Sequence, residues 1–183
     1  MGSLAPSLLL AMPQLVDENF VRTVVLLCKH SEEGALGLVV NRPLMTTGRV
    51  TVNLDPPVST DRELQVWVGG PVDQERTWIL VGEEPDEHDA PSVRLGDQLY
   101  LSTSPELLLR LLEPTPPPLA RLIVGYAGWG PGQLEAELHA SAWLMSDVDR
   151  DLVFNTPADR MWEAAIRRLG ADPASLQTSR GVH

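Results

Sequence analysis

Two apolar, β-branched runs in the first quarter of the chain constrain the fold more than any other feature. "RTVVLLCKH" covers residues 22–30 and "GALGLVVNRP" covers residues 34–43, and the polar segment "SEEG" joins them. Runs of this composition with so short a polar link are typical of a β-hairpin. Because each run has a continuous apolar stretch at its centre, they indicate strands that are covered on both faces and lie in the middle of a sheet.

More strands are expected beyond this hairpin. "LQVWVGG" (64–70) and "RTWILVG" (76–82) repeat the apolar pattern around "PVDQE", and "QLYLSTS" (98–104) adds a shorter alternating strand. The run "ARLIVGYA" (120–127) is a further strand candidate. The early half of the chain is therefore predicted to be mostly β.

Helix signals are fewer and lie later in the chain. Ser104 as a cap and Pro114 as a stop bound a helix near 105–113. The segment "TPADRMWEAAIRRLG" opens with Thr156 in capping-box order and closes at Gly170, which predicts a second helix. "DPASL" starts one further helical turn.

Length and charge bound the class of protein. A chain of 183 residues suits one hydrophobic core, so a single domain over residues 1–183 is expected. The chain has 25 Asp plus Glu against 14 Lys plus Arg, a formal net charge of -11. Such a field repels the phosphate backbone, so direct nucleic-acid binding is not expected.

The apolar segments also bear on location. "SLLLAMP" is shorter than the apolar region of a signal peptide and no Lys or Arg precedes it. No apolar run approaches the ~20 residues that cross a membrane. A cytoplasmic protein without a membrane partner is the expectation, and the single cysteine, Cys28, excludes an internal disulfide framework.

The segment "GYAGWGPGQLEAEL" (125–138) invites comparison with phosphate-binding loops. Its glycines match the first two of a G-x-G-x-x-G fingerprint, but Gln133 stands where the third glycine belongs, and the helix that follows, about 132–140, is short. The lysine of a P-loop is missing too. A tight turn without a ligand is favoured. Trp129 in this turn either packs on the core, which is favoured, or lines a surface pocket.

Metal and nucleophile patterns are weak. "DVDRD" (147–151) resembles the start of a calcium loop, but Leu152 and Ala158 replace the required Gly and Glu, which leaves at most a weak surface magnesium site. The four histidines are too scattered for zinc spacing, so no metal or cofactor is expected. Cys28 and His30 are two apart on one predicted strand and would share a face, where the imidazole would lower the pKa of the thiol. A buried, inert cysteine is the favoured alternative.

Taken in order, "LLLAMPQLVDENFVRTVVLLCKHSEEGALGLVVNRP", "VWVGGPV" and "GYAGWGPGQLEAEL" followed by "AWLM" resemble the AlgH/YqgE family of bacterial proteins. The resemblance spans nearly the whole chain. It rests on three blocks, Asp17–Pro43, Gly69–Val72 and Gly125–Leu138, which are specific together. "VFNTPADRMWEAAIRRLG" also looks like the closing helix of the family.

The resemblance implies an α+β fold, in which a mainly antiparallel, bifurcated sheet curls into a pseudo-barrel with flanking helices. It implies no reaction, because the common label of the family is transcriptional regulator and no catalytic residues are generally established. Direct regulation at DNA conflicts with the charge of this chain and with the absence of a basic recognition helix. Indirect regulation fits better.

The sequence thus favours a non-catalytic cytoplasmic protein that binds a protein partner or a small ligand. The binding face would be formed by three Gly/Pro turns at strand ends, residues 41–43, 69–71 and 128–133. Arg42, Gln133 and Glu135 would supply polar contacts, and their alternative role is hydrogen bonding within turns and the helix start. A second hypothesis is an enzyme or binder of a small phosphorylated or nucleotide-like metabolite, with Asp147 or Glu135 as acid or base. The candidate contact residues are Asn41, Arg42, Pro43, Gly69, Gly70, Pro71, Gly128, Trp129, Gly130, Gln133 and Glu135.

Overall fold

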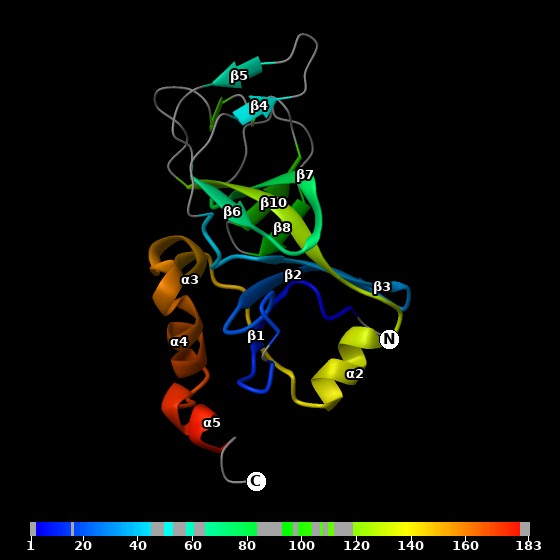
Figure 1. The fold of residues 1–183 in the computed structure, drawn as a ribbon, viewed down its shortest axis with the longest axis vertical. Helices are drawn as coiled ribbons and strands as arrows, with labels where there is room; N and C mark the ends of the chain where they lie inside the picture. The colour runs from blue at the N-terminus through cyan, green and yellow to red at the C-terminus, as the bar shows by residue number, and fades with distance from the viewer. Residues whose placement is uncertain are drawn as a thin grey trace.

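Strands dominate the structure, which is a computed structural model (Figure 1). It describes residues 3–15, 17–44, 50–52, 58–60, 65–83, 93–96, 99–103, 107, 110–111 and 119–179. The strands within these ranges are β1 (Ser7–Ala11), β2 (Val24–Ser31), β3 (Gly34–Val39), β4 (Val50–Val52), β5 (Val58–Thr60), β6 (Val66–Val68), β7 (Val72–Val81), β8 (Val93–Gly96), β9 (Leu99–Ser102), β10 (Ala120–Trp129) and β11 (Trp143–Ser146). The helices are α2 (Gln133–His139), α3 (Arg150–Asn155), α4 (Ala158–Arg168) and α5 (Pro173–Ser179).

The main sheet divides along β10. Its strand order is β11-β1-β2-β3-β10-β7-β9-β8, and all these pairs are antiparallel. Residues 127–129, at the C-terminal end of β10, pair with β3. Nearer its start, residues 122–124 pair in parallel with β6, and residues 120–126 pair with β7 on the opposite edge. The sheet curls into a half-barrel with a few helices, so the α+β fold that the family resemblance implies is confirmed.

Helices cover both faces of the sheet at β1 and β2. On one face, Leu10 and Leu26 pack with Met161 and Ile166 of α4. On the other face, the neighbouring strand residues pack with Leu134 of α2. Figure 1 accordingly shows α4 and α2 on opposite sides of these strands. The prediction that the early hairpin lies mid-sheet is confirmed, but both faces are covered only over residues 24–27 and 37–39, and the half of the hairpin at its turn is partly exposed.

The closing helix begins differently from the prediction. Pro157 is the N-cap of α4, and no side chain caps this helix. Thr156, the predicted cap, instead ends α3 in an extended conformation. The helix is held to the sheet by the Trp162 indole, which donates to the carbonyl of Ala11 at 2.7 Å. Packing of its apolar face therefore replaces the cap that the sequence pattern suggested.

Some elements were not predicted. β1 consists of Leu and Ala with one Ser, a composition without the β-branched residues that signal a strand, and β11 has only four residues. The predicted helix near 105–113 falls mostly outside the described residues. In the described parts of the chain, no helix is both long and apolar enough to cross a membrane.

Candidate functional site

Two of the three predicted turn segments meet where the sheet divides. The amide of Val39, the last residue of β3, donates to the carbonyl of Gly69 at 2.8 Å, and the amide of Val68 donates to the carbonyl of Arg42 at 2.8 Å. The amide of Gly69 in turn donates to Val124 of β10 at 2.7 Å. The segments 41–43 and 69–71 are thus joined by backbone hydrogen bonds.

Glycine is required here because backbone packs on backbone. A Cβ atom on Gly70, whose φ is +156°, would lie 2.2 Å from the carbonyl of Tyr126. A Cβ atom on Gly69 would lie 2.5 Å from the carbonyl oxygen of Gly125, which has a φ of +78° in the bulge of β10. Two blocks of the family resemblance, around Gly69 and Gly125, therefore interlock physically.

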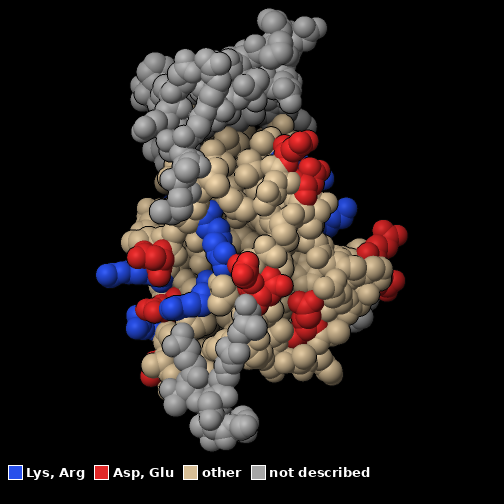
Figure 2. Space-filling model, viewed as in Figure 1, with Lys and Arg blue, Asp and Glu red and all other residues tan. Residues whose placement is uncertain are grey.

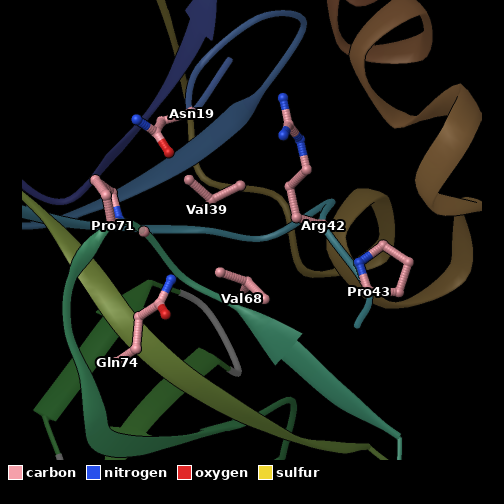
Figure 3. Close-up of a pocket in the computed structure, with 8 residues that line it drawn as sticks. Asn19, Val39, Arg42, Pro43, Val68, Pro71 and Gln74 are labelled. Atoms are coloured by element: carbon pink, nitrogen blue, oxygen red, sulfur yellow. The ribbon is translucent and has the colours of Figure 1, made fainter. Parts of the chain in front are cut away.

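A pocket of about 240 Å³ opens between these two turns (Figure 3). Figure 3 shows Val39 and Val68 between the turns, with Asn19 and Arg42 on one side and Gln74 on the other. Its lining combines an apolar floor, two prolines, two side-chain amides and one guanidinium, from Asn19, Val39, Arg42, Pro43, Val68, Gly70, Pro71 and Gln74. Apolar surface with a few convergent polar groups is typical of a binding site.

Arg42 is held in place by neutral groups. Its Nη1 donates to the carbonyl of Glu18 at 3.0 Å and its Nη2 to the carbonyl of Val21 at 2.7 Å. The carboxylates in the described ranges make no ion pair with it. The guanidinium is therefore fixed at the pocket wall while its charge remains uncompensated by an acid.

Asn41 has a structural role. It is 9 % exposed, its Oδ1 accepts from the amide of Val24 at 3.0 Å, and its Nδ2 donates to the carbonyl of Arg22 at 3.0 Å. At the start of β2, the side-chain oxygen therefore takes the place of a backbone carbonyl as acceptor for the amide of Val24. Both of its polar atoms have a backbone partner, and the residue is not among those that line the pocket.

The third predicted segment, 128–133, lies elsewhere. Trp129 pairs with Ala35, whereas the pocket begins at Val39, four residues or about 13 Å further along β3. Trp129 instead borders a second, open hollow of about 290 Å³, which shares no lining residue with the pocket. The expectation that all three turns form one face is wrong in this geometry, because β10 carries the glycine corner away from the point where the sheet divides.

Trp129 belongs to the core, as the favoured alternative had it. It is 6 % exposed and packs edge-on against Trp143, with ring centroids 6.0 Å apart. Both indole nitrogens donate to the same oxygen of Glu137, at 3.2 Å from Trp129 and 2.9 Å from Trp143. Because the ring is buried and its nitrogen has an acceptor, Trp129 serves to pack the core and offers little surface to a ligand.

Residues of the glycine corner form hydrogen bonds with one another and with α2. The amide of Gly130 donates to Oε1 of Gln133 at 3.0 Å, and Nε2 of Gln133 donates to Glu137 at 3.0 Å. Gly132, with a φ of +74°, is the N-cap of a seven-residue helix. The amides of Gly130 and Gln133 are therefore already bonded, which leaves the corner less suited to hold a phosphate, and Gln133 has the helix-start role considered for it.

Glu135 contacts His30 rather than a pocket. Nδ1 of His30 accepts from the amide of Leu4 at 3.0 Å, so the proton of the neutral ring is placed on Nε2, which hydrogen-bonds the Glu135 carboxylate. This hydrogen bond lowers the pKa of Glu135. The direction is opposite to the one that makes a carboxyl group a general acid at neutral pH.

Cys28 is not a nucleophile in this environment. A bulge between Leu27 and Lys29 shifts the register, so His30 pairs with Ala35 on the face opposite to the one on which Cys28 packs. The shared face expected from their spacing is therefore wrong. Burial raises the pKa of the Cys28 thiol to about 12, whereas a reactive cysteine needs a lowered one.

Other polar groups have structural roles. Within the ranges that the structure describes, no three acidic, His or Cys side chains gather as metal ligands. Asp149 of "DVDRD" caps α3, where its carboxylate accepts from the amide of Leu152 at 3.0 Å. Asp147 is exposed beside a different hollow, with Ser3 and Leu169.

Four of the residues that line the pocket are among the candidates from the sequence: Arg42, Pro43, Gly70 and Pro71. The other four were missed: Asn19, Val39, Val68 and Gln74. Asn19 lies in a polar turn and Gln74 in the polar first half of β7, and nothing in their local pattern separates them from other surface amides. The two valines read as ordinary strand residues. Their shared position depends on the divided sheet, which no local signal encodes.

Comparison with known proteins gives a consistent result. A family model described as AlgH-like matches residues 8–174. A UPF0301 protein of Myxococcus xanthus is 40 % identical over 185 residues, covering 100 % of both chains. A UPF0301 protein of Vibrio cholerae is 37 % identical over 180 residues, covering 94 % of this chain and 95 % of its own.

Solved structures agree with the fold. The solution structure of the AlgH protein from Pseudomonas aeruginosa matches with a TM-score of 0.73 at 35 % identity, covering 95 % of this chain and 93 % of that one. A crystal structure of a Corynebacterium diphtheriae protein matches with a TM-score of 0.67 at 23 % identity, covering 97 % and 91 %. The second likeness supports the fold alone.

Proposed function

The chain belongs to the AlgH-like family, and on that premise we propose that it is a non-catalytic, cytoplasmic regulatory protein that binds a protein partner at the pocket between residues 41–43 and 69–71. The observation that carries the proposal is the meeting of two Gly/Pro turns, far apart in sequence, at a single pocket with fixed backbone. Loops held by a rigid sheet are where folds place binding residues.

The size and openness of the pocket favour a polypeptide over a metabolite. Its volume of about 240 Å³ is below the ~300–1,000 Å³ of ordinary small-molecule pockets. Such a volume accommodates a protruding side chain with its flanking backbone. Proline and valine walls beside two amides suit a loop that brings both apolar and polar groups.

A catalytic role lacks the necessary groups at this pocket. The described lining contains no carboxylate, imidazole, thiol or hydroxyl, and its one ionisable side chain is Arg42. General acid–base chemistry needs a group that titrates near the working pH, which a guanidinium does not. The enzyme hypothesis therefore receives no support from this pocket.

Direct DNA binding is not proposed either. On the part of the face that Figure 2 describes, acidic side chains are interspersed among the basic ones, and no continuous basic band is visible. With the net charge of -11, this arrangement opposes phosphate binding. Any effect on transcription would be transmitted through the partner.

A photo-crosslinking amino acid at position 19 tests the proposal. Asn19 borders the pocket, is exposed, and its side chain makes no hydrogen bond within the described residues. We expect a discrete adduct with one protein when the labelled chain is illuminated in cells of a bacterium that carries it. The matched control places the same amino acid at Ser31, which borders the separate hollow beside Trp129.

Two results would contradict the proposal. One is an adduct pattern at position 19 that equals the pattern at position 31. The other is no adduct at position 19 while a screen of metabolites raises the melting temperature, since a ligand at 100 times its Kd contributes ~2.7 kcal/mol. The second result would move the function to the small-ligand alternative.

A further inference from the structure

We propose that the pocket recognises a carboxylate, an Asp or Glu side chain on the partner polypeptide, through Arg42 with the amides of Asn19 and Gln74. This inference rests on the proposed function, because it names the chemistry of the partner at the same site.

Arg42 supplies a fixed, uncompensated charge. Its two hydrogen bonds go to backbone carbonyls of Glu18 and Val21, which orient the guanidinium without neutralising it. These bonds use two of five N–H donors, so three remain available. A guanidinium held by neutral groups at a pocket wall is arranged for an incoming anion, and a carboxylate matches its planar donors.

The two amides are free to complete the site. Within the described part of the chain, the side chains of Asn19 and Gln74 make no hydrogen bond, and Figure 3 shows them on different sides of the pocket. The backbone amide of Asn19 is bonded to Asp17 at 2.8 Å, which fixes the position of the residue. Each amide nitrogen can donate to an anionic oxygen.

A singly charged, planar group fits better than a phosphate. Phosphate sites usually combine several cations or a nest of backbone amides with the anion. Here one guanidinium lines the described pocket, and acids lie close by in sequence to its lining residues, Asp17 and Glu18 beside Asn19 and Asp73 and Glu75 on either side of Gln74 in β7. These acids, together with the net charge of -11, raise the cost of a dianion more than that of a monoanion.

Capped tripeptides test the chemistry directly. The probes are acetyl-Gly-Asp-Gly-amide, the isosteric acetyl-Gly-Asn-Gly-amide, acetate and inorganic phosphate, each titrated into the isotope-labelled full chain. We expect the Asp peptide to shift the side-chain amide signals of Asn19 and Gln74 and the Nε signal of Arg42 at millimolar concentration. The Asn peptide should leave these signals unchanged.

Charge variants at one position give opposite expected signs. Asn19→Asp should weaken binding of the Asp peptide by roughly three- to five-fold, and Asn19→Lys should strengthen it by a similar factor. Neither change removes a side-chain hydrogen bond made by Asn19 in the described structure, so both variants should fold. Ser31→Asp, which can still accept from the amide of Glu33, adds the same charge at a distance and should have little effect.

The outcomes separate this inference from the proposed function. Equal shifts with Asp and Asn peptides, or no dependence on charge at position 19, would overturn carboxylate recognition even if the crosslinked partner is retained. Stronger binding of phosphate would overturn it as well. If acetate bound as tightly as the Asp peptide, the claim that the carboxylate belongs to a polypeptide would be contradicted. A peptide response without any crosslinked partner would instead support the site and contradict the proposed function.

Discussion

Gly70 is the residue at which a single atom should matter most. A Cβ atom there would overlap the backbone of Tyr126. The two segments are held together on either side of Gly70, because the amide of Gly69 donates to Val124 of β10 and Val72 pairs with Tyr126. We therefore predict that Gly70→Ala destabilises the protein by about 3 kcal/mol or more, at the upper end of overpacking effects. Chemical denaturation measures this loss.

Gly132 provides the matched control. It also has a positive φ, of +74°, but a Cβ atom there would meet nothing within 4 Å. Gly132→Ala should lose only the left-handed backbone preference of glycine, about 1 kcal/mol. Similar losses in the two variants would mean that conformational freedom, and not the backbone contact at Tyr126, explains Gly70.

Residue roles were predictable only where they depend on local chemistry. The glycines at positions 69 and 70 stand out in the sequence as turn residues, and Gln133 could be assigned to a helix start from its place after the turn. Asn41 could not be separated from Arg42 in the sequence, because both stand at the end of the same predicted strand, residues 34–43. Their roles differ because their hydrogen-bond partners differ. Asn41 bonds to the backbone of Val24 and Arg22, whereas Arg42 bonds to the backbone of the turn at residues 18–21.

At the scale of elements, Asp149 connects two helices. It caps α3 through Leu152 and pairs with Arg168 at the end of α4. The hydrogen bond from Arg168 is the main reason that the pKa of Asp149 is lowered. A lowered pKa means that the stabilisation is present above ~3.9, the pKa of an unfolded Asp, and is lost as the pH falls through the lower folded value.

Two variants separate the charge from the cap. Asn at position 149 keeps an oxygen for Leu152 but loses the ion pair, so Asp149→Asn should cost under about 1 kcal/mol at pH 7 and nothing at a pH below the folded pKa. Asp149→Ala also loses the cap and should cost a further ~0.5–2 kcal/mol at both pH values. Denaturation midpoints at pH 7 and in acid check both values. A difference between wild type and Asp149→Asn that persists in acid would disprove the ionic contribution.

Elements with strong periodicity or β-branched composition were predictable, and those held by tertiary contacts were not. The hairpin of β2 and β3 and the helix α4 lie close to their predicted ranges. β1 has leucines that suit a helix equally well, and it is a strand because β2 and β11 pair with it. The sequence pattern missed the first half of β7, which begins at Val72. The segment "VDQER" has no apolar alternation and is exposed, so it gave no strand signal.

At the scale of the molecule, β10 belongs to both parts of the divided sheet. It pairs with β3 on one side of the division and with β6 and β7 on the other, so neither part has a complete set of strand partners alone. We predict a single cooperative unfolding transition, as expected for one domain. The five tryptophans allow the test, because Trp67 and Trp78 report on one part, and Trp129, Trp143 and Trp162 on the other.

Fluorine-labelled tryptophan resolves the five side chains in one urea titration. Their native signals should disappear at a common midpoint that also matches the loss of far-ultraviolet circular dichroism. If the signals of Trp67 and Trp78 disappear at a lower urea concentration than those of Trp129 and Trp143, the chain contains two separately unfolding units. The expectation of one domain would then be wrong.

The division of the sheet is the feature that sequence analysis by pattern alone could not supply. Periodicity indicates which runs are strands, but the choice of partners depends on the bulge at Gly125 and on Gly69 entering between Val39 and Val124. The family resemblance supplied the bifurcated architecture as an expectation. The pocket follows from that division, which is why its four missed residues had no local signal.

The burial of Cys28 has a practical consequence for labelling. Its pKa is raised to about 12, so the thiol stays protonated at pH 7, and the sulfur donates to the carbonyl of Leu26. Because the chain has no other cysteine, a cysteine introduced at an exposed position such as Asn19 would react with a maleimide dye while the native thiol stays silent. Single-molecule fluorescence at the pocket is therefore accessible without first removing a core residue.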